Sequence, residues 1–277
     1  MTSEQPLYEK TLQRDIDLIR DKVTEMYKLD HRALTEAIGS LKTFNRQQAY
    51  SIILRDERID ELEKEIDRLC LEFLVRQQPV ALHLRFAYVT IKINQELERI
   101  GDYAESIARQ VLKISKASKL PPLDLFEAIA NISISMLESA VKSFLEGDAG
   151  LARQTMEIEE ETDNLRDQIN NEMYELQKEG KIPFKSLAPL LTIGRRFERV
   201  ADQAKNLCEE VIYMCTGEYA KHKGKEVWRI LFVDDHNSYR SQMAEGIGNS
   251  FGLPKLLFRS AGLEPVSYTH LTLPTKA

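Results

Sequence analysis

The chain has 277 residues, of which 43% are hydrophobic, 30% charged and only 8% aromatic, so it can bury a core and is not a disordered polypeptide. It holds only 12 glycines and 9 prolines, and so few breakers favour long helices over a turn-rich β architecture. The formal net charge is −6 with acids and bases interleaved, which excludes a basic surface for nucleic acid. We therefore expect a mostly helical protein that does not bind nucleic acid.

The sequence also predicts a cytoplasmic protein without membrane insertion. Its first residues lack the basic and apolar regions of a secretory signal, and no uncharged run approaches the ~18 residues of a membrane-spanning helix. The three cysteines, Cys70, Cys208 and Cys215, are odd in number and show no Cys-x-x-Cys spacing. They therefore indicate neither a disulfide framework nor a zinc site.

Prolines punctuate the first 220 residues and leave six long segments that are predicted to be helices. In the third and sixth segments apolar residues recur at alternating spacings of four and three, from Ile93 to Ile114 and from Leu190 to Met214. Such apolar seams need partner helices, and short connections make sequential helices antiparallel neighbours, which predicts a helical bundle. The predicted helices lie near residues 12–43, 47–77, 83–116, 123–146, 151–179 and 186–216.

The two halves of this helical region repeat each other. ELERIGD at 96–102 matches RFERVAD at 196–202, and Asp60 matches Asp163 within two acid-rich segments. Each half is therefore predicted to be a three-helix unit, with the Pro121-Pro122 pair as the joint. The predicted fold class is all-α, with two tandem three-helix bundles followed by a truncated α/β fragment. The predicted domains are residues 1–120, 121–222 and 223–265, followed by a tail at 266–277.

Each half carries two acidic pairs at the spacing i, i+4. On a helix such residues are neighbours, and two like charges there cost roughly 0.2–0.5 kcal/mol unless something neutralises them. The pairs border the apolar seams, so the acidic stripes of two helices in one bundle can face each other and form an all-oxygen site for hard cations. The candidate metal ligands are Asp56 with Asp60, Glu98 with Asp102, Glu159 with Asp163, and Glu198 with Asp202.

The alternative interpretation is a solvated charged face. Arg99, Arg166 or Arg199 can form surface salt bridges with these acids, each worth ~0–1 kcal/mol. The recurrence of the acids in both halves favours the metal site, because a face without a function need not copy its acids.

These features of the sequence resemble a known family. The duplicated three-helix units, the paired acidic motifs, and the segments ELERIGDYAESIA and FERVADQAKNLCEEVIYMCTGE resemble the PhoU family of phosphate-transport accessory and phosphate-signalling regulators, over about residues 5–222. The resemblance implies a cytoplasmic, non-enzymatic and commonly homodimeric negative regulator. It also implies contacts with the phosphate ABC transporter ATPase and a sensor histidine kinase. Finally, it implies that the four acidic pairs bind metal ions such as iron, Mg²⁺ or Mn²⁺.

The pattern changes after Lys225, where EVWRILFVDD is typical of a buried strand, SQMAEGIGNSF of a helix and LPKLLFRSAGLEP of a second strand. HNSYRSQMAEG with RSAGLEP resembles the start of low-molecular-weight tyrosine phosphatases and arsenate reductases, in which backbone N–H groups and an arginine cradle an oxyanion. Arg240 and Ser241 match the end of that loop, but Asp234 stands where the family has its nucleophilic cysteine. We therefore expect no thiol-based phosphatase or reductase activity.

Two further expectations concern this last region. ILFVDDH also resembles the first strand of a response-regulator receiver, although RSAGLEP favours the phosphatase-like interpretation. Residues 266–277 resemble a translated sequencing adapter, which places the end of the natural reading frame near Pro265.

Three classes of function thus remain: a metal-binding signalling adaptor, a phosphatase or arsenate reductase, and a purely structural scaffold. The adaptor explains most of the chain, including its duplicated acids.

Overall fold

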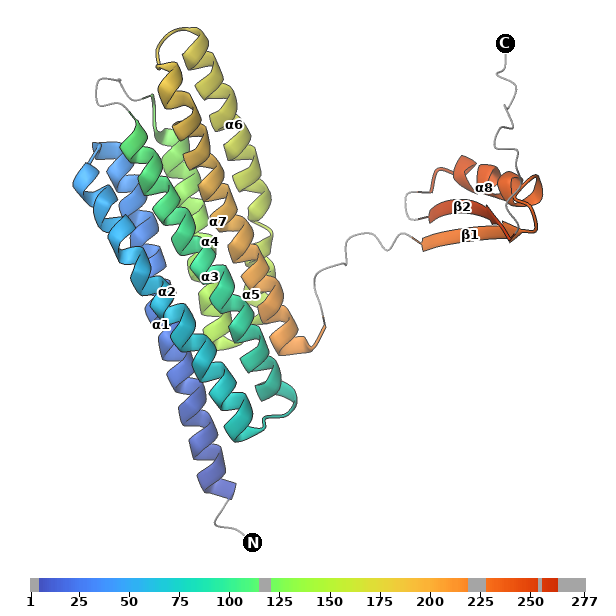
Figure 1. Cartoon of the computed structure of the whole chain (residues 1–277), viewed down its shortest axis with the longest axis horizontal. Helices are drawn as coiled ribbons and strands as arrows, with labels where there is room; N and C mark the ends of the chain where they lie inside the picture. Colours follow the sequence, from blue (N-terminus) through green and yellow to red (C-terminus); the bar gives the residue numbers. More distant parts are fainter. Residues whose placement is uncertain (1–4, 115–120, 219–227, 254–255, 264–277) are drawn as a thin grey trace. The chain divides into compact units, whose positions relative to one another are not determined.

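The structure is a computed structural model that describes residues 5–114, 121–218, 228–253 and 256–263, in two compact units comprising residues 1–220 and 221–277. The first unit is entirely helical, as predicted (Figure 1). The expected linker at 221–225 and the expected adapter-derived tail at 266–277 lie outside the described residues. No helix within the described ranges is both long and apolar enough to cross a membrane.

The helices of the first unit follow the predicted segments with one exception, although the first helix begins at Gln5, well before the predicted start near residue 12. Asn45 caps the second helix by accepting a hydrogen bond from the Gln48 amide at 3.1 Å, and Gly147 closes the fourth in the left-handed conformation. The helices are α1 (Gln5–Thr43), α2 (Arg46–Gln77), α3 (Ala81–Lys113), α4 (Asp124–Glu146), α5 (Ala149–Met156), α6 (Glu159–Lys178) and α7 (Phe184–Thr216).

The exception is the predicted helix at 151–179, which was wrong because the structure breaks it into α5 and α6. Glu157 and Ile158 separate the two helices, and their amides bond to carbonyls only three residues earlier. Because of the break, the first turn of α6 contains three consecutive glutamates, Glu159, Glu160 and Glu161. Acids are favourable there because the amino end of a helix carries a partial positive charge.

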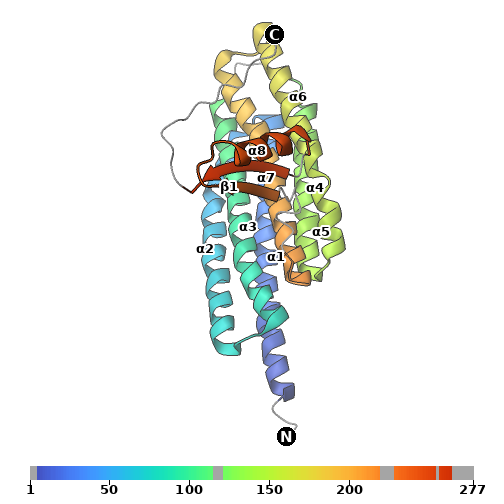
Figure 2. The same cartoon turned by 90° about the vertical axis from the view of Figure 1, so that its right-hand side faces the viewer.

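The first unit packs as two bundles, one of three helices and one of four, because the predicted middle helix of the second half is broken in two. In the first half, α1, α2 and α3 pack against one another, and in the second half α4, α5 and α6 all pack against α7. The long helices α3 and α7 lie side by side and join the halves, as Figures 1 and 2 show. The apolar seams predicted on α3 and α7 are buried in this arrangement, from Ile93 to Val111 and from Leu190 to Met214.

The repeat extends into the first helix of each half. Met26, Leu34 and Ala37 of α1 correspond to Ile129, Leu137 and Ala140 of α4, and all six side chains are buried. Ser40 and Ser143 occupy one equivalent position, and each donates a hydrogen bond to the carbonyl three residues before it. Any position that differs between α1 and α4 can therefore be compared directly.

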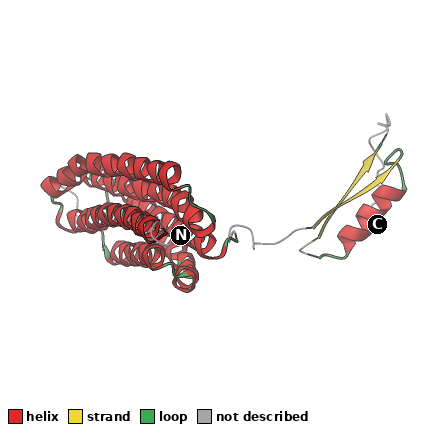
Figure 3. Cartoon of the chain, turned by 90° about the horizontal axis from the view of Figure 1, so that it is seen from below, coloured by secondary structure: helices red, strands yellow, loops and turns green. Residues whose placement is uncertain are grey.

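The second unit contains two strands and a helix, as predicted (Figure 3). Strand β1 (Trp228–Asp234) pairs in parallel with β2 (Leu256–Gly262), with Trp228 opposite Leu256. Helix α8 (Arg240–Ser250) connects the strands and packs on both. This strand–helix–strand order is the one that the sequence indicates for residues 223–265.

Candidate functional site

The structure brings the four predicted acids of the first half together between α2 and α3. Two more acids continue the same stripes one turn further along, Glu63 on α2 and Glu105 on α3. The charges of both helices interact across the gap, since Glu105 and Asp102 of α3 both act on Asp56 of α2. We call this set the first-half cluster; its members are Asp56, Asp60, Glu63, Glu98, Asp102 and Glu105.

Burial and neighbouring acids raise the pKa of four carboxyl groups in the first-half cluster, Asp56, Glu63, Glu98 and Asp102. Partial burial raises the pKa of Glu98 to about 7, with the charges of Asp102, Glu63 and Asp60 adding to the effect. Burial likewise raises the pKa of Asp56 to about 6, reinforced by Glu105, Asp102 and Asp60. The cluster is therefore short of positive charge.

Of the nearby arginines, Arg109 pairs with Glu105 of the first-half cluster at 2.5 Å, and the others have partners outside it. Arg99 pairs with Glu96 at 3.5 Å, and Arg196 donates to the Ser106 hydroxyl at 3.0 Å and lies over the Tyr103 ring. Among the described residues, no Lys or Arg forms an ion pair with any of the four acids that the sequence predicts as ligands here, Asp56, Asp60, Glu98 and Asp102.

The second half has the same acids but not the same charge. We call Glu159, Asp163, Glu198 and Asp202, which lie between α6 and α7, the second-half cluster. Where the first half continues its stripes with Glu63 and Glu105, the second half places Arg166 and Lys205, at the repeat offsets of 103 and 100 residues.

These two bases form ion pairs with the second-half cluster, although burial still raises the pKa of Glu198 and of Asp202. Arg166 lies 3.3 Å from Glu198 Oε1 and 3.5 Å from Asp163 Oδ1, and Lys205 lies 2.7 Å from Glu159 Oε2. Arg199 adds a contact of 3.5 Å to Asp202. The salt bridges proposed as the alternative interpretation of the acidic pairs are thus present in the second half, and they involve Arg166 and Arg199 as expected.

A seventh acid of the first half, Asp30 of α1, was not among the predicted ligands. Its side chain is fully buried, and neither carboxylate oxygen has a hydrogen-bond partner within the described part of the chain. Burial raises its pKa well above the usual value, and the charges of Asp56 and Glu98 add to the effect. A buried, unpaired carboxylate costs several kcal/mol in its charged form, so it calls for a partner.

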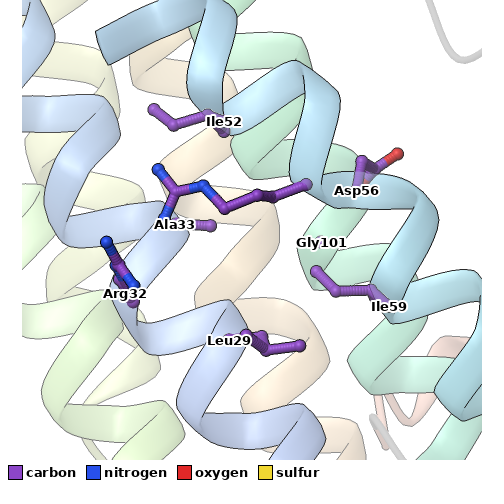
Figure 4. A pocket seen from close by; sticks show the side chains of 8 residues that line it. Leu29, Arg32, Ala33, Ile52, Asp56, Ile59 and Gly101 are labelled. Atoms are coloured by element: carbon purple, nitrogen blue, oxygen red, sulfur yellow. The ribbon is translucent and has the colours of Figure 1, made fainter.

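Gly101 makes room for Asp30 on the opposite helix. A Cβ atom at Gly101 would lie 3.3 Å from Asp30 Oδ1 and 2.9 Å from the Ile59 side chain, so the aspartate approaches α3 directly. A small pocket at this point is lined by residues of all three helices, among them Leu29, Asp56, Ile59 and Gly101 (Figure 4). The second half has Ala201 in place of Gly101.

The residues of the two clusters differ in how well they suit a hard cation. Across residues 5–114, 121–218, 228–253 and 256–263, no three His, Cys, Asp or Glu side chains converge into a ready-made metal group. The first-half cluster nevertheless has the chemistry of such a site, with carboxylates of raised pKa and the orphaned oxygens of Asp30 beside it. The second-half cluster fits less well, because bases already occupy its carboxylates.

The second unit was predicted to retain part of an anion loop at Arg240 and Ser241. Here the Asp234 carboxylate accepts hydrogen bonds from the Ser241 amide at 3.0 Å and from the Asn237 amide at 2.5 Å. The Ser241 hydroxyl donates to the Asn237 side chain at 2.7 Å. The loop amides thus bind the chain's own carboxylate, and these bonds lower the pKa of Asp234. An external anion would have to displace it.

Sequence reasoning missed three members of the first-half site, although signals for them exist. Glu63 and Glu105 each follow an acidic pair at the next helical spacing, three residues on. Asp30 interrupts the buried series of α1 between Met26 and Leu34, where an apolar residue is expected. A polar residue inside a seam, like an acid exchanged for a base between repeats, indicates a specialised position.

Comparisons with known proteins agree on the first unit. The PhoU domain model matches residues 23–111 and 126–211. The phosphate-specific transport system accessory protein PhoU homolog 1 of Thermotoga maritima is 32% identical, over 76% of this chain and 90% of that protein. The PhoU accessory protein of Escherichia coli is 27% identical, over 76% of this chain and 87% of that protein.

Solved structures share the fold. The crystal structure of the phosphate transport system regulatory protein PhoU from Streptococcus pneumoniae superposes with a TM-score of 0.70 and 24% identity, over 75% of this chain and 98% of that one. PhoU from Pseudomonas aeruginosa gives the same score, over 74% and 99%. The family resemblance found in the sequence is confirmed, whereas the phosphatase-like resemblance of residues 223–265 stays a prediction. The chain belongs to the PhoU domain family.

Proposed function

We propose that this protein is a cytoplasmic accessory regulator of phosphate uptake, which restrains phosphate-starvation signalling as a metal-binding adaptor between the phosphate ABC transporter ATPase and a sensor histidine kinase. The observation that carries the proposal is the family match over both repeats, together with acidic clusters at equivalent places in each. The relatives are named as accessory proteins of a phosphate-specific transport system. Their names describe accessory and regulatory proteins, in agreement with the expectation of a non-enzymatic regulator.

The proposal assigns hard cations, such as iron, Mg²⁺ or Mn²⁺, to the carboxylates. A bound cation would neutralise charge and fix the spacing of α2 and α3. The first-half residues that would hold it are Asp56, Asp60, Glu98 and Asp102. The second-half residues are Glu159, Asp163, Glu198 and Asp202, where the contacts of Arg166 and Lys205 must first open. A homodimer is part of the proposal through the family resemblance alone.

Elemental analysis of the purified full chain tests the metal assignment. The double variant Asp102→Ala with Asp202→Ala is expected to lose bound metal while its helicity by circular dichroism is unchanged. Asp17→Ala with Asp124→Ala removes the same charge at sites remote from both clusters and serves as the control. A parent protein without metal, or a double variant with unchanged metal content, contradicts the metal assignment.

The regulatory role needs a cellular test. In phosphate-replete cells that lack this protein, a phosphate-starvation reporter should be active, and the full chain should repress it. Pull-down of the transporter ATPase and of the kinase with the tagged full chain tests the adaptor role. Repression without either contact would contradict that role, and a reporter that ignores the protein would contradict the regulatory function.

A further inference from the structure

The buried carboxylate of Asp30 is the group in the first unit that the proposed function does not use. Its equivalent in the second half is Ser133 of α4, at the same offset that relates the serines Ser40 and Ser143. Ser133 is equally buried, but its hydroxyl lies within 2.7 Å of both the Ile129 and the Phe197 carbonyl oxygens. The fold can therefore satisfy a polar side chain at this position internally.

Asp30 is not satisfied in that way. When ionised, the carboxylate can only accept hydrogen bonds, and when protonated its O–H has no acceptor among the described residues, so neither form is bonded as Ser133 is. The two arginines that line the neighbouring pocket, Arg32 and Arg55, are both directed to Glu36. Within the described residues, then, neither oxygen of Asp30 has a positive or hydrogen-bonding partner.

The surroundings of Asp30 connect it to the first-half cluster. Its Oδ1 approaches α3 at Gly101, which lies directly before Asp102 and one turn after Glu98. The absent side chain of Gly101 leaves the carboxylate next to the backbone that carries those two acids, and Asp56 lines the adjoining pocket (Figure 4). Acids of α2 and α3 thus lie near enough to Asp30 of α1 for the charges of Asp56 and Glu98 to act on it.

We propose that Asp30 donates a carboxylate from α1 to a hard cation bound by the first-half cluster, which makes this a three-helix site that the second half cannot copy. This inference rests on the proposed metal binding and adds a ligand outside the paired acidic motifs. A cation there gives the orphaned oxygens the positive partner that they lack. Because Ser133 supplies no charge, the second half must bind cations more weakly.

Titration of the full chain with Mn²⁺, with free Mn²⁺ followed by electron paramagnetic resonance, tests the inference. The variants are Asp30→Ser, which copies the second half, and Asp30→Asn, which keeps the shape without the charge. Both should weaken the tightest Mn²⁺ site by at least about 10-fold, because a lost ligand costs no less than a lost outer partner. Asp21→Ser, an exposed position on the same helix, is the matched control and should bind as the parent does.

Thermal unfolding without metal separates a ligand from a structural residue. Asp30→Ser should unfold at the same temperature as the parent or higher, because it removes an unpaired buried acid. The increase in unfolding temperature on adding Mn²⁺ should be smaller in this variant than in the parent. Unchanged Mn²⁺ affinity in both variants overturns the inference and leaves the proposed function intact. Loss of folding in both variants would assign Asp30 a structural role and also overturn it. A parent chain that binds no Mn²⁺ overturns both proposals.

Discussion

The two halves of the helical unit share one architecture and differ in how their acids are balanced. Between α2 and α3 six acids line the gap, whereas between α6 and α7 the last position of each stripe is basic, at Arg166 and Lys205. The first half adds the buried Asp30 where the second half has the fully bonded Ser133. Duplication thus preserved the bundle, while a few substitutions gave each copy its own electrostatics.

The largest effect is expected from making the second half resemble the first. Arg166→Glu with Lys205→Glu removes the nearest cation from the buried Glu198 and the cation bound to Glu159, so stability without metal should fall by about 2–4 kcal/mol. The second-half affinity for Mn²⁺ should rise by about 10-fold or more, because affinity follows the number of charged ligands.

Chemical denaturation and Mn²⁺ titration measure the two effects. Arg153→Glu with Lys181→Glu makes the same change of net charge at exposed sites and is the control. If both double variants respond equally, the neutralising role of Arg166 and Lys205 is wrong.

The next prediction concerns Gly101. Alanine there places a Cβ 2.9 Å from Ile59 and 3.3 Å from Asp30, so Gly101→Ala should destabilise the protein by about 1–3 kcal/mol despite the higher helix propensity of alanine. Gly39→Ala is the matched helical control, because its nearest neighbour would lie 3.9 Å away, and it should stabilise by up to about 1 kcal/mol. Denaturant midpoints of the two variants test this prediction, provided that the denaturant dependence of the unfolding free energy is unchanged. A stabilised Gly101→Ala variant would contradict the close packing around Gly101.

The raised pKa values predict how stability varies with pH in the absence of metal. Glu98 and Asp56 bind protons more tightly when folded, with pKa values of about 7 and about 6. Their unfolded values lie near 4, so stability should decline as the pH rises from about 4 to about 8, by roughly 1–2 kcal/mol after allowance for solvent screening. Glu98→Gln should flatten this slope in urea titrations, and a slope of the opposite sign in the parent would contradict the unbalanced charge.

The smallest effect should come from Ser133. Ser133→Ala leaves the Phe197 carbonyl without this donor and should cost about 1 kcal/mol. Thr35→Ala removes a hydroxyl that bonds only within its own exposed turn, and its cost should stay below about 0.5 kcal/mol. Equal thermal shifts for the two variants would mean that the bond between α4 and α7 adds nothing.

Most of the fold could be predicted from the sequence because the apolar seams on α3 and α7 have an unambiguous helical period. The sequence also placed the paired acids, since an i, i+4 spacing fixes neighbours on one helix. The break at Glu157 was missed because the residues on both sides are helix formers, and only the advantage of acids at a new helix start separates them. Asp30 was missed because its partners lie on other helices, which spacing along one helix does not reveal.

The central claim is that the first half is the stronger cation site. Crystals of the full chain soaked in Mn²⁺, with anomalous difference density measured at the manganese edge, test it most directly. The strongest peak is expected between α2 and α3, within coordination distance of Glu98, Asp102 and Asp30, with a weaker peak or none between α6 and α7. A stronger peak beside Glu198 and Asp202, or peaks of equal height in the two halves, would contradict it.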